Sequence, residues 1–245
     1  MPSTSIFLDQ VHSEWAPIIE RALHTLSDDY RQNLLATNDW TPGKHKVFAA
    51  FSEPLSSVRT LLIGESPYPR VESANGYAFW DANVQDLWSE TGLSKAVNRA
   101  TSLRNLMKML LFARGDLGDD FSQPAIAAVD KSKFHQTASS FFNGLMTKGF
   151  LLLNATPVYR ENEIKYHAKL WQRFMLIILD ALLEYNPSIS LILLGRIALR
   201  VPGCDRFECL IAEHPYNVSF ITNPGVIEFF KPLDLLIDHE KTNHG

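Results

Sequence analysis

The side chains that could do chemistry gather in three short polar clusters of this chain. "GESPYP" (Gly64–Pro69) follows the apolar run "RTLLI", "NATP" (Asn154–Pro157) follows "GFLLL", and "EHPYN" (Glu213–Asn217) follows "ECLIA". The clusters supply carboxylates, hydroxyls, amides and an imidazole, which transfer protons and hydrogen-bond polar ligands. Because ligands bind beyond the carboxyl ends of the strands in an open parallel sheet, we expect the three clusters to converge on one pocket.

Each cluster also has a purely structural interpretation. Gly64 and Pro67 are typical turn residues, Asn154 is a common helix cap or turn residue, and His214 before Pro215 could be a hydrogen-bonded histidine at a strand end. From the residues alone these alternatives stay open.

Two sharper alternatives conflict with the sequence. "GESPY" resembles half of the serine-hydrolase elbow G-x-S-x-G, but the second glycine is absent. The elbow also needs the backbone N–H of the residue after the serine, and Pro67 has none. No glycine-rich loop follows a predicted strand, which argues against a Rossmann or P-loop nucleotide site. Cys204 and Cys209 match no usual metal-binding spacing.

Strands and helices alternate in the predicted secondary structure. Four apolar runs, at residues 59–66, 149–156, 190–196 and 208–215, are typical of strands buried on both faces. Helices are predicted around residues 15–26, 103–112 and 167–185, and the last has a core-facing stripe at Leu170, Phe174, Ile177, Ile178 and Ala181. We therefore predict an α/β protein with a central, mainly parallel four-stranded β-sheet flanked by helices, in which residues 1–245 form a single domain.

The composition is that of an ordinary globular protein. The 245 residues are 46% hydrophobic and 20% charged, and the net charge of -4 gives no bulk attraction to polyanions. Any nucleic-acid binding must then rest on a local surface. "MPSTSIFLDQ" has no basic region followed by an apolar stretch, and Asp180 interrupts the run "FMLIILDALL". We expect a cytoplasmic protein that does not enter a membrane.

Taken in order, these motifs resemble those of the uracil-DNA glycosylase superfamily, most closely its first family. The resemblance covers most of the chain and rests on order and spacing. In this chain Gly64–Pro69 resembles the family's G-Q-D-P-Y-H, and "GYAFW" (Gly76–Trp80) resembles its G-L-x-F-S. Further along, "ATSLRN" (Ala100–Asn105) resembles P-P-S-L-x-N, and "LLLNATPVY" (Leu151–Tyr159) resembles L-L-L-N-x-x-L-T-V. The last motif, "HPYNVS" (His214–Ser219), resembles H-P-S-P-L-S.

The resemblance implies a pocket for a base flipped out of DNA. By position, Phe79 is similar to the family's stacking phenylalanine, and Asn154 to the asparagine that pairs with N3–H and O4 of uracil. Tyr68 matches the tyrosine that crowds C5 and excludes thymine. His214 matches the histidine that hydrogen-bonds O2 and stabilises the departing uracil anion.

Ser66 departs from the family pattern. The family has an aspartate there, which positions the attacking water and stabilises the cationic sugar, whereas serine is uncharged and a very poor base. Glu65 is a candidate substitute, since another branch of the superfamily carries G-E-A-P-G at this turn. A surface carboxylate, or an acceptor for backbone amides, is the alternative for Glu65.

The loop that contacts DNA differs from the family pattern as well. Val218 stands where the family has the leucine that wedges into the duplex, and Tyr216 and Asn217 replace its S-P pair. Candidate phosphate contacts are Ser102 and Ser219 by motif match. Arg160, Lys165 and His167 lie nearby in sequence, where a solvated surface at the start of a helix is the alternative to a phosphate contact.

We thus expect a monomeric DNA-repair glycosylase that hydrolyses the N-glycosidic bond of uracil or a related damaged base. The expected partner is uracil-containing or damaged DNA, and no cofactor or metal is implied. Without the aspartate, the reaction should be slow. The alternative is a catalytically silent DNA- or base-binding protein of the same fold.

Overall fold

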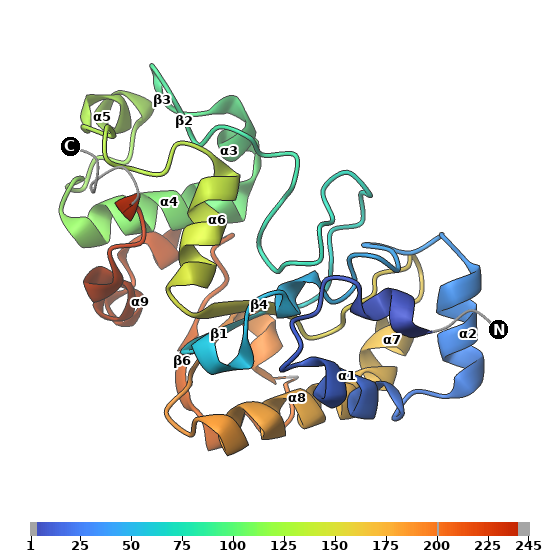
Figure 1. Cartoon of the computed structure of the whole chain (residues 1–245). Coiled ribbons are helices and arrows are strands. Elements are labelled where there is room, and N and C mark those ends of the chain that lie inside the picture. The colour runs from blue at the N-terminus through green and yellow to red at the C-terminus, as the bar shows by residue number, and fades with distance from the viewer. Residues whose placement is uncertain (1–3, 200, 240–245) are drawn as a thin grey trace. The chain divides into compact units, whose positions relative to one another are not determined.

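A four-stranded sheet forms the centre of the fold in the computed structural model, which describes residues 4–199 and 201–239. The strands are β1 (Thr60–Gly64), β4 (Phe150–Asn154), β5 (Ser190–Leu194) and β6 (Glu208–Ala212), in the order β4-β1-β5-β6. Strand β1 pairs in parallel with both β4 and β5, and helices flank the sheet (Figure 1). The predicted α/β fold with a mainly parallel four-stranded sheet is confirmed.

Burial differs between the central strands and the last one. Every residue of β1 and β4 is buried, as is β5 after its first residue, because parallel strands are covered on both faces. In β6 no residue is fully buried, and Ile211 is 62% exposed. The prediction that all four strands are buried on both faces is therefore wrong for β6, which is the last strand in the sheet order and so has a neighbour on one side only.

The chain divides into two compact units. Unit 1 comprises the described residues within Met1–Asp81, Gly149–Leu193 and Ile197–Cys209, and unit 2 those within Ala82–Lys148, Leu194–Arg196 and Leu210–Gly245. That residues 1–245 act as one domain stays a prediction. No helix within the described parts of the chain is long and apolar enough to cross a membrane.

Unit 1 is built around a helix pair. Helix α1 (Ala16–Leu23) packs on α8 (Gln172–Tyr185), which buries Phe174, Ile178 and Ala181 of the predicted stripe (Figure 1). The predicted helix at residues 167–185 is in fact two, because α7 (Ile164–Leu170) ends at Trp171 before α8 begins. The unit also holds α2 (Asp28–Ala36) and short 3-10 helices at Thr4–Leu8, Ala49–Phe51, Leu55–Ser57 and Cys204–Arg206.

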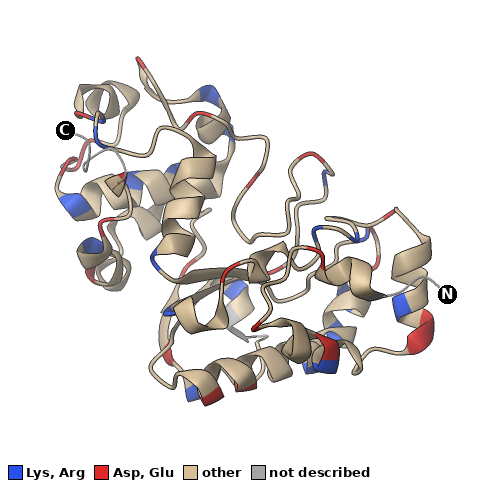
Figure 2. Cartoon of the chain, in the orientation of Figure 1, with Lys and Arg blue, Asp and Glu red and all other residues tan. Residues whose placement is uncertain are grey.

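Unit 2 is mainly helical. Its longest helix is α4 (Thr101–Arg114), which confirms the helix predicted at residues 103–112 and ends at Gly115 in the left-handed conformation. Against α4 lie α9 (Pro224–Phe230) and the 3-10 helix Val218–Thr222. Three helices of this unit begin at a side-chain cap: α3 (Lys95–Arg99) at Ser94, α5 (Gln123–Ala128) at Ser122 and α6 (Ala138–Thr147) at Thr137. The short strands β2 (Trp88–Ser89) and β3 (Gly92–Leu93) form an antiparallel pair. Charged residues of both signs are spread over the elements of each unit (Figure 2).

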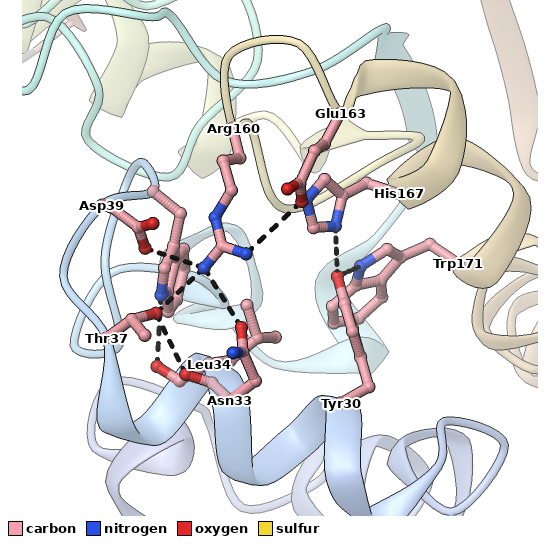
Figure 3. Close-up of polar contacts among 10 residues, drawn as sticks. Tyr30, Asn33, Leu34, Thr37, Asp39, Arg160, Glu163, His167 and Trp171 are labelled. Carbon is pink, nitrogen blue, oxygen red and sulfur yellow. Dashed lines mark hydrogen bonds and ion pairs between the residues drawn. The ribbon is translucent and has the colours of Figure 1, made fainter.

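A buried hydrogen-bonded chain inside unit 1 joins Tyr30, His167 and Trp171 (Figure 3). Trp171 Nε1 donates to Tyr30 Oη at 2.9 Å, and Tyr30 Oη lies 2.5 Å from His167 Nδ1. His167 Nε2 lies 3.2 Å from Glu163 Oε2, and a carboxylate can only accept, so this contact favours the neutral imidazole with its proton on Nε2 and with Nδ1 accepting the tyrosine O–H. Burial lowers the pKa of His167, with the nearby Glu163 carboxylate opposing the shift, so the ring is neutral at pH 7.

Arg160 ties the same region to the end of α2. Its Nη2 donates to Asp39 Oδ1 at 2.7 Å, to Thr37 Oγ1 at 2.9 Å and to Asn33 Oδ1 at 3.2 Å (Figure 3). The side chain is only 15% exposed, and that of His167 is fully buried. The interpretation of a solvated surface at the start of a helix is therefore wrong for Arg160 and His167, because Arg160 ties the segment before α7 to the end of α2 and His167, within α7, contacts Tyr30 of α2.

We predict that Tyr30→Phe lowers the free energy of unfolding by about 1 to 3 kcal/mol, because the indole N–H of Trp171 and Nδ1 of His167 each lose their buried partner. Denaturant unfolding followed by circular dichroism measures the change. Tyr185→Phe is the matched control, since Tyr185 is 51% exposed and such a surface change should stay within about 0.5 kcal/mol. Equal stabilities of the two variants would contradict the proposed hydrogen-bonded chain.

Candidate functional site

The ends of β1 and β4 bring Gly64 and Asn154 side by side. The two residues are register partners in the parallel pair, and the Asn154 side chain lies over the glycine. A Cβ atom at Gly64 would stand 2.8 Å from Asn154 Oδ1 and 3.0 Å from the Cβ of Ala78. Glycine is therefore required at this position for Asn154 to keep its place.

Asn154 is 4% exposed, so its amide is almost completely removed from solvent. Within the part of the chain that the structure describes, no hydrogen bond satisfies this side chain, and its polar atoms still reach accessible space. A buried amide without a partner is costly. Its donor and its acceptor are thus available to a ligand that presents a complementary pair.

The turn that follows β1 is held from two sides. On one side, Ala155 N–H donates to Gly64 O at 2.8 Å and Thr156 N–H to Glu65 O at 3.1 Å, which continues the pairing of β1 and β4 past their ends. On the other, Thr41 Oγ1 donates to Tyr68 O at 2.7 Å. Glu65 is exposed and Ser66 is half-buried on this fixed turn.

Tyr68 and Phe79 form the next part of the site. Tyr68 Oη donates to Phe79 O at 3.4 Å, and burial, with the charge of Asp81, raises the pKa of Tyr68 to about 12, so the hydroxyl keeps its proton. Phe79 has a φ of 65°, a left-handed conformation that costs a non-glycine residue about 1 to 3 kcal/mol. Such strain persists where the surroundings impose it, and here Ala78 N–H is bonded to Leu152 O of β4 at 3.0 Å.

His214 belongs to unit 2, where its tautomer is defined by a neighbour. Tyr216 N–H donates to His214 Nδ1 at 3.1 Å, so the neutral ring carries its proton on Nε2 and can donate from there. Gly195, with a φ of 76°, allows the close approach of His214, because a Cβ there would lie 2.8 Å from the histidine Cβ.

The loop after His214 projects its side chains outward from a fixed backbone. Asn105 of α4 donates from Nδ2 to Pro215 O at 2.7 Å and is 1% exposed. Tyr216 and Val218 are 69% and 70% exposed, and Asn217 and Ser219 are exposed as well. Large apolar side chains held in water on a rigid loop are suited to contact with a partner.

Unit 1 thus brings together Glu65, Ser66, Tyr68, Phe79 and Asn154 of the predicted site. Unit 2 brings together His214, Tyr216, Asn217, Val218 and Ser219, while Ser102 lies half-buried in the first turn of α4. The convergence of all three polar clusters on one pocket stays a prediction.

Two positioning residues were absent from the predicted site. Thr41 holds the turn at Tyr68, and no local pattern around it indicates that contact. Asn105 had a signal, since it is an amide among the buried apolar residues Leu103, Leu106 and Met107 of one helix. A buried amide on such a face needs a specific partner.

Comparisons with known proteins agree on one family. No protein-family model matches the chain. Curated uracil-DNA glycosylases of Corynebacterium glutamicum and Pediococcus pentosaceus are 26% and 25% identical, each over 85% of this chain and over 81% and 82% of their own lengths. A mimivirus uracil-DNA glycosylase structure, 16% identical, has a TM-score of 0.60 over 87% of this chain and 71% of its own, which shows the shared fold alone.

A much nearer structure is the crystal structure of wild-type UNG from Nitratifractor salsuginis. It is 40% identical, covers 94% of this chain and 94% of its own, and superposes with a TM-score of 0.89. Identity of that size over nearly the whole of both chains shows that this protein belongs to the uracil-DNA glycosylase family.

Proposed function

We propose that the protein excises uracil, or a related damaged base, from DNA by hydrolysis of the N-glycosidic bond. The observation that carries the proposal is the buried amide of Asn154, which has no hydrogen-bond partner among the described residues and lies at the carboxyl end of a parallel strand. Uracil offers N3–H and O4 side by side, and one carboxamide complements both. Family membership supports the same substrate class.

In this proposal the other side chains recognise the faces and remaining edges of the flipped base. Phe79, held in its strained conformation, stacks on the ring, and Tyr68 crowds C5 with an aromatic ring that stays uncharged. His214 donates from Nε2 to O2, where negative charge develops as the bond breaks. The tautomer supports this role, because the N–H of Tyr216 already occupies Nδ1.

Ser66 and Glu65 decide the rate in this proposal. The turn places a hydroxyl where the family has an aspartate, and a hydroxyl neither accepts a proton from water at neutral pH nor stabilises a cationic sugar. Catalysis then depends on the charge stabilisation from His214, with Glu65 as the candidate substitute base. The reaction is accordingly slow.

The DNA strand is assigned to the loop after His214. Tyr216 and Val218 lie exposed at its surface and can contact bases next to the flipped one, and Asn217, Ser219 and Ser102 can contact the backbone. Burial raises the pKa of Glu213, but the hydrogen bonds from its own backbone N–H, from Ser219 and from Asn223 together outweigh burial and lower the pKa below its usual value. This carboxylate therefore stays charged at the base of the loop. We propose that the protein acts as a monomer in the cytoplasm without a cofactor.

A second function is favoured by the uncharged Ser66 itself. A chain with an intact base pocket and no catalytic carboxylate could bind flipped bases without excising them. Excision and binding differ at this turn, so substitutions there separate the two functions.

We predict that free uracil binds to the protein and that Asn154→Ala weakens its binding by about 1 to 3 kcal/mol, because one edge of the base loses its partner. Gly64→Ala should weaken uracil binding as well, since its Cβ would stand 2.8 Å from Asn154 Oδ1. Isothermal titration calorimetry measures both. Gly118→Ala is the matched control, because a Cβ there meets nothing within 4 Å. Uracil binding that is unchanged by Asn154→Ala would exclude this pocket.

We predict that Ser66→Asp raises single-turnover excision of uracil from an oligonucleotide by at least about tenfold, because it restores a carboxylate near the water and the sugar. Glu65→Gln is the companion variant. Added to Ser66→Asp, Glu65→Gln should leave the gain in rate largely intact. Introduced alone into the parent, it should lower the excision rate if Glu65 is the substitute base. If neither the parent nor a folded Ser66→Asp variant excises uracil, the result would favour the silent binding protein, provided that the parent still binds uracil-containing DNA more tightly than undamaged DNA.

A further inference from the structure

A second pocket opens beside the turn that carries Ser66. Its volume is about 470 Å³, within the range of about 300 to 1,000 Å³ that small-ligand sites occupy. Glu65 and Ser66 line it on one side, and Ala155 and Thr156 follow Asn154 into its wall. None of the proposed base-contacting residues Tyr68, Phe79 or Asn154 lines it.

Helix α7 presents opposite faces to the core and to this pocket. His167 is fully buried on the core side through its contact with Tyr30. Lys165 and Lys169 lie one helical turn apart on the pocket side, with Ala168 between them. The contacts in Figure 3 hold the His167 side of α7 toward the core, and Lys165 and Lys169 on its other side line the pocket.

The charge of the pocket favours an anion. Both lysines are exposed, and neither has an ion-pair partner among residues 4–199 and 201–239. The lining includes one carboxylate, Glu65, at the edge shared with the turn. Two lysines on one helix face can reach successive phosphates of a nucleic-acid strand.

The rest of the lining favours a sugar over a base. The buried side chains of Met175, Ile197 and Val201 line the pocket, and they are aliphatic or thioether groups. Among the described residues no aromatic side chain lines it, and bases of single strands bind chiefly by stacking on aromatic rings. Aliphatic surface instead suits the apolar edge of a deoxyribose.

The backbone connects this pocket to the proposed base site. Thr156 N–H donates to Glu65 O at 3.1 Å, so the pocket wall and the turn form one rigid unit at the ends of β1 and β4. Thr156, which donates this bond, lies two residues after Asn154 on the chain. A strand whose target base reaches Asn154 therefore has its neighbouring backbone near Glu65 and Thr156.

We infer that this pocket, defined by Lys165, Lys169 and the aliphatic floor, binds the sugar-phosphate unit next to the target nucleotide on the same DNA strand. The inference rests on the proposed function and adds a subsite to it. The two lysines neutralise the phosphates on either side of one deoxyribose, whose carbon atoms contact the floor.

The test is the salt dependence of DNA binding by the full chain. The probe is a fluorescein-labelled single-stranded oligonucleotide with one tetrahydrofuran abasic analogue, followed by anisotropy. In Lys165→Gln/Lys169→Gln the slope of log K against log salt should fall by roughly 1.4, at about 0.7 per phosphate contact of a single strand. Between about 50 and 200 mM salt the parent should therefore lose about sevenfold more affinity than the variant.

The matched control is Arg21→Gln/Arg173→Gln, which removes the same charge from two exposed residues of unit 1 outside the pocket. Its slope should equal that of the parent. Ala168→Phe tests the apolar half of the pocket without a change of charge, and it should weaken oligonucleotide binding at least about threefold by filling the space between the lysines. Neither pocket variant should change the affinity for free uracil.

The outcomes separate this inference from the proposed function. An unchanged slope in the lysine variant, with free uracil and the oligonucleotide still bound, overturns the subsite and leaves the glycosylase proposal standing. The subsite is also overturned if the two lysines are needed to bind free thymidine monophosphate but their loss leaves the salt slope of oligonucleotide binding unchanged. The pocket would then serve a free nucleotide. A parent that binds neither uracil nor the oligonucleotide contradicts both proposals.

Discussion

The parallel pairing of β1 with β4 is the constraint on which the candidate site depends. It sets Gly64 beside Asn154, and only a residue without a Cβ leaves room for the amide there. The same pairing continues through Ala155 and Thr156, which fixes the turn that carries Glu65 and Ser66. Two chemically distinct surfaces thus share one rigid backbone: the buried amide of Asn154 and the pocket lined by Lys165 and Lys169.

Buried polar contacts, rather than apolar burial alone, orient the segment between β4 and α8. The apolar stripe of α8 defines which side of that helix faces the core, but α7 has few large apolar residues. Its orientation follows from His167, which finds its partner in Tyr30 of α2. A buried polar side chain tolerates few arrangements, because each alternative leaves a donor or acceptor unsatisfied. The contact between His167 and Tyr30 therefore explains how a helix of only seven residues keeps a fixed orientation and presents two lysines to the pocket.

The sequence predicted the elements that rest on periodicity and missed what rests on single contacts. The four strands and α4 follow from apolar runs of the right length. The break at Trp171 was not visible, because the apolar spacing of α7 and α8 runs through it. Arg160 and His167 were wrongly interpreted as solvated, because polar residues around the start of a helix are usually exposed and the partners of these two lie more than a hundred residues away. The family motifs supplied the candidate site residues and include Asn105, whereas Thr41 acts through a contact that no local pattern encodes.

Net charge limits how this protein can hold DNA. At -4 the chain gains little from long-range attraction to phosphates, so its affinity must come from short-range contacts. Extruding a base from an intact duplex costs a few kcal/mol, and the cost is least where the base is mismatched or already single-stranded. In the proposed function Val218 takes the place of a leucine wedge, and its shorter side chain would fill less of the space that a flipped base leaves in the stack. Under the proposed function, weak attraction and a small wedge would together favour strands in which the target base is already unpaired, because there the proposed contacts at Asn154 and the neighbouring backbone need not offset the cost of opening the duplex.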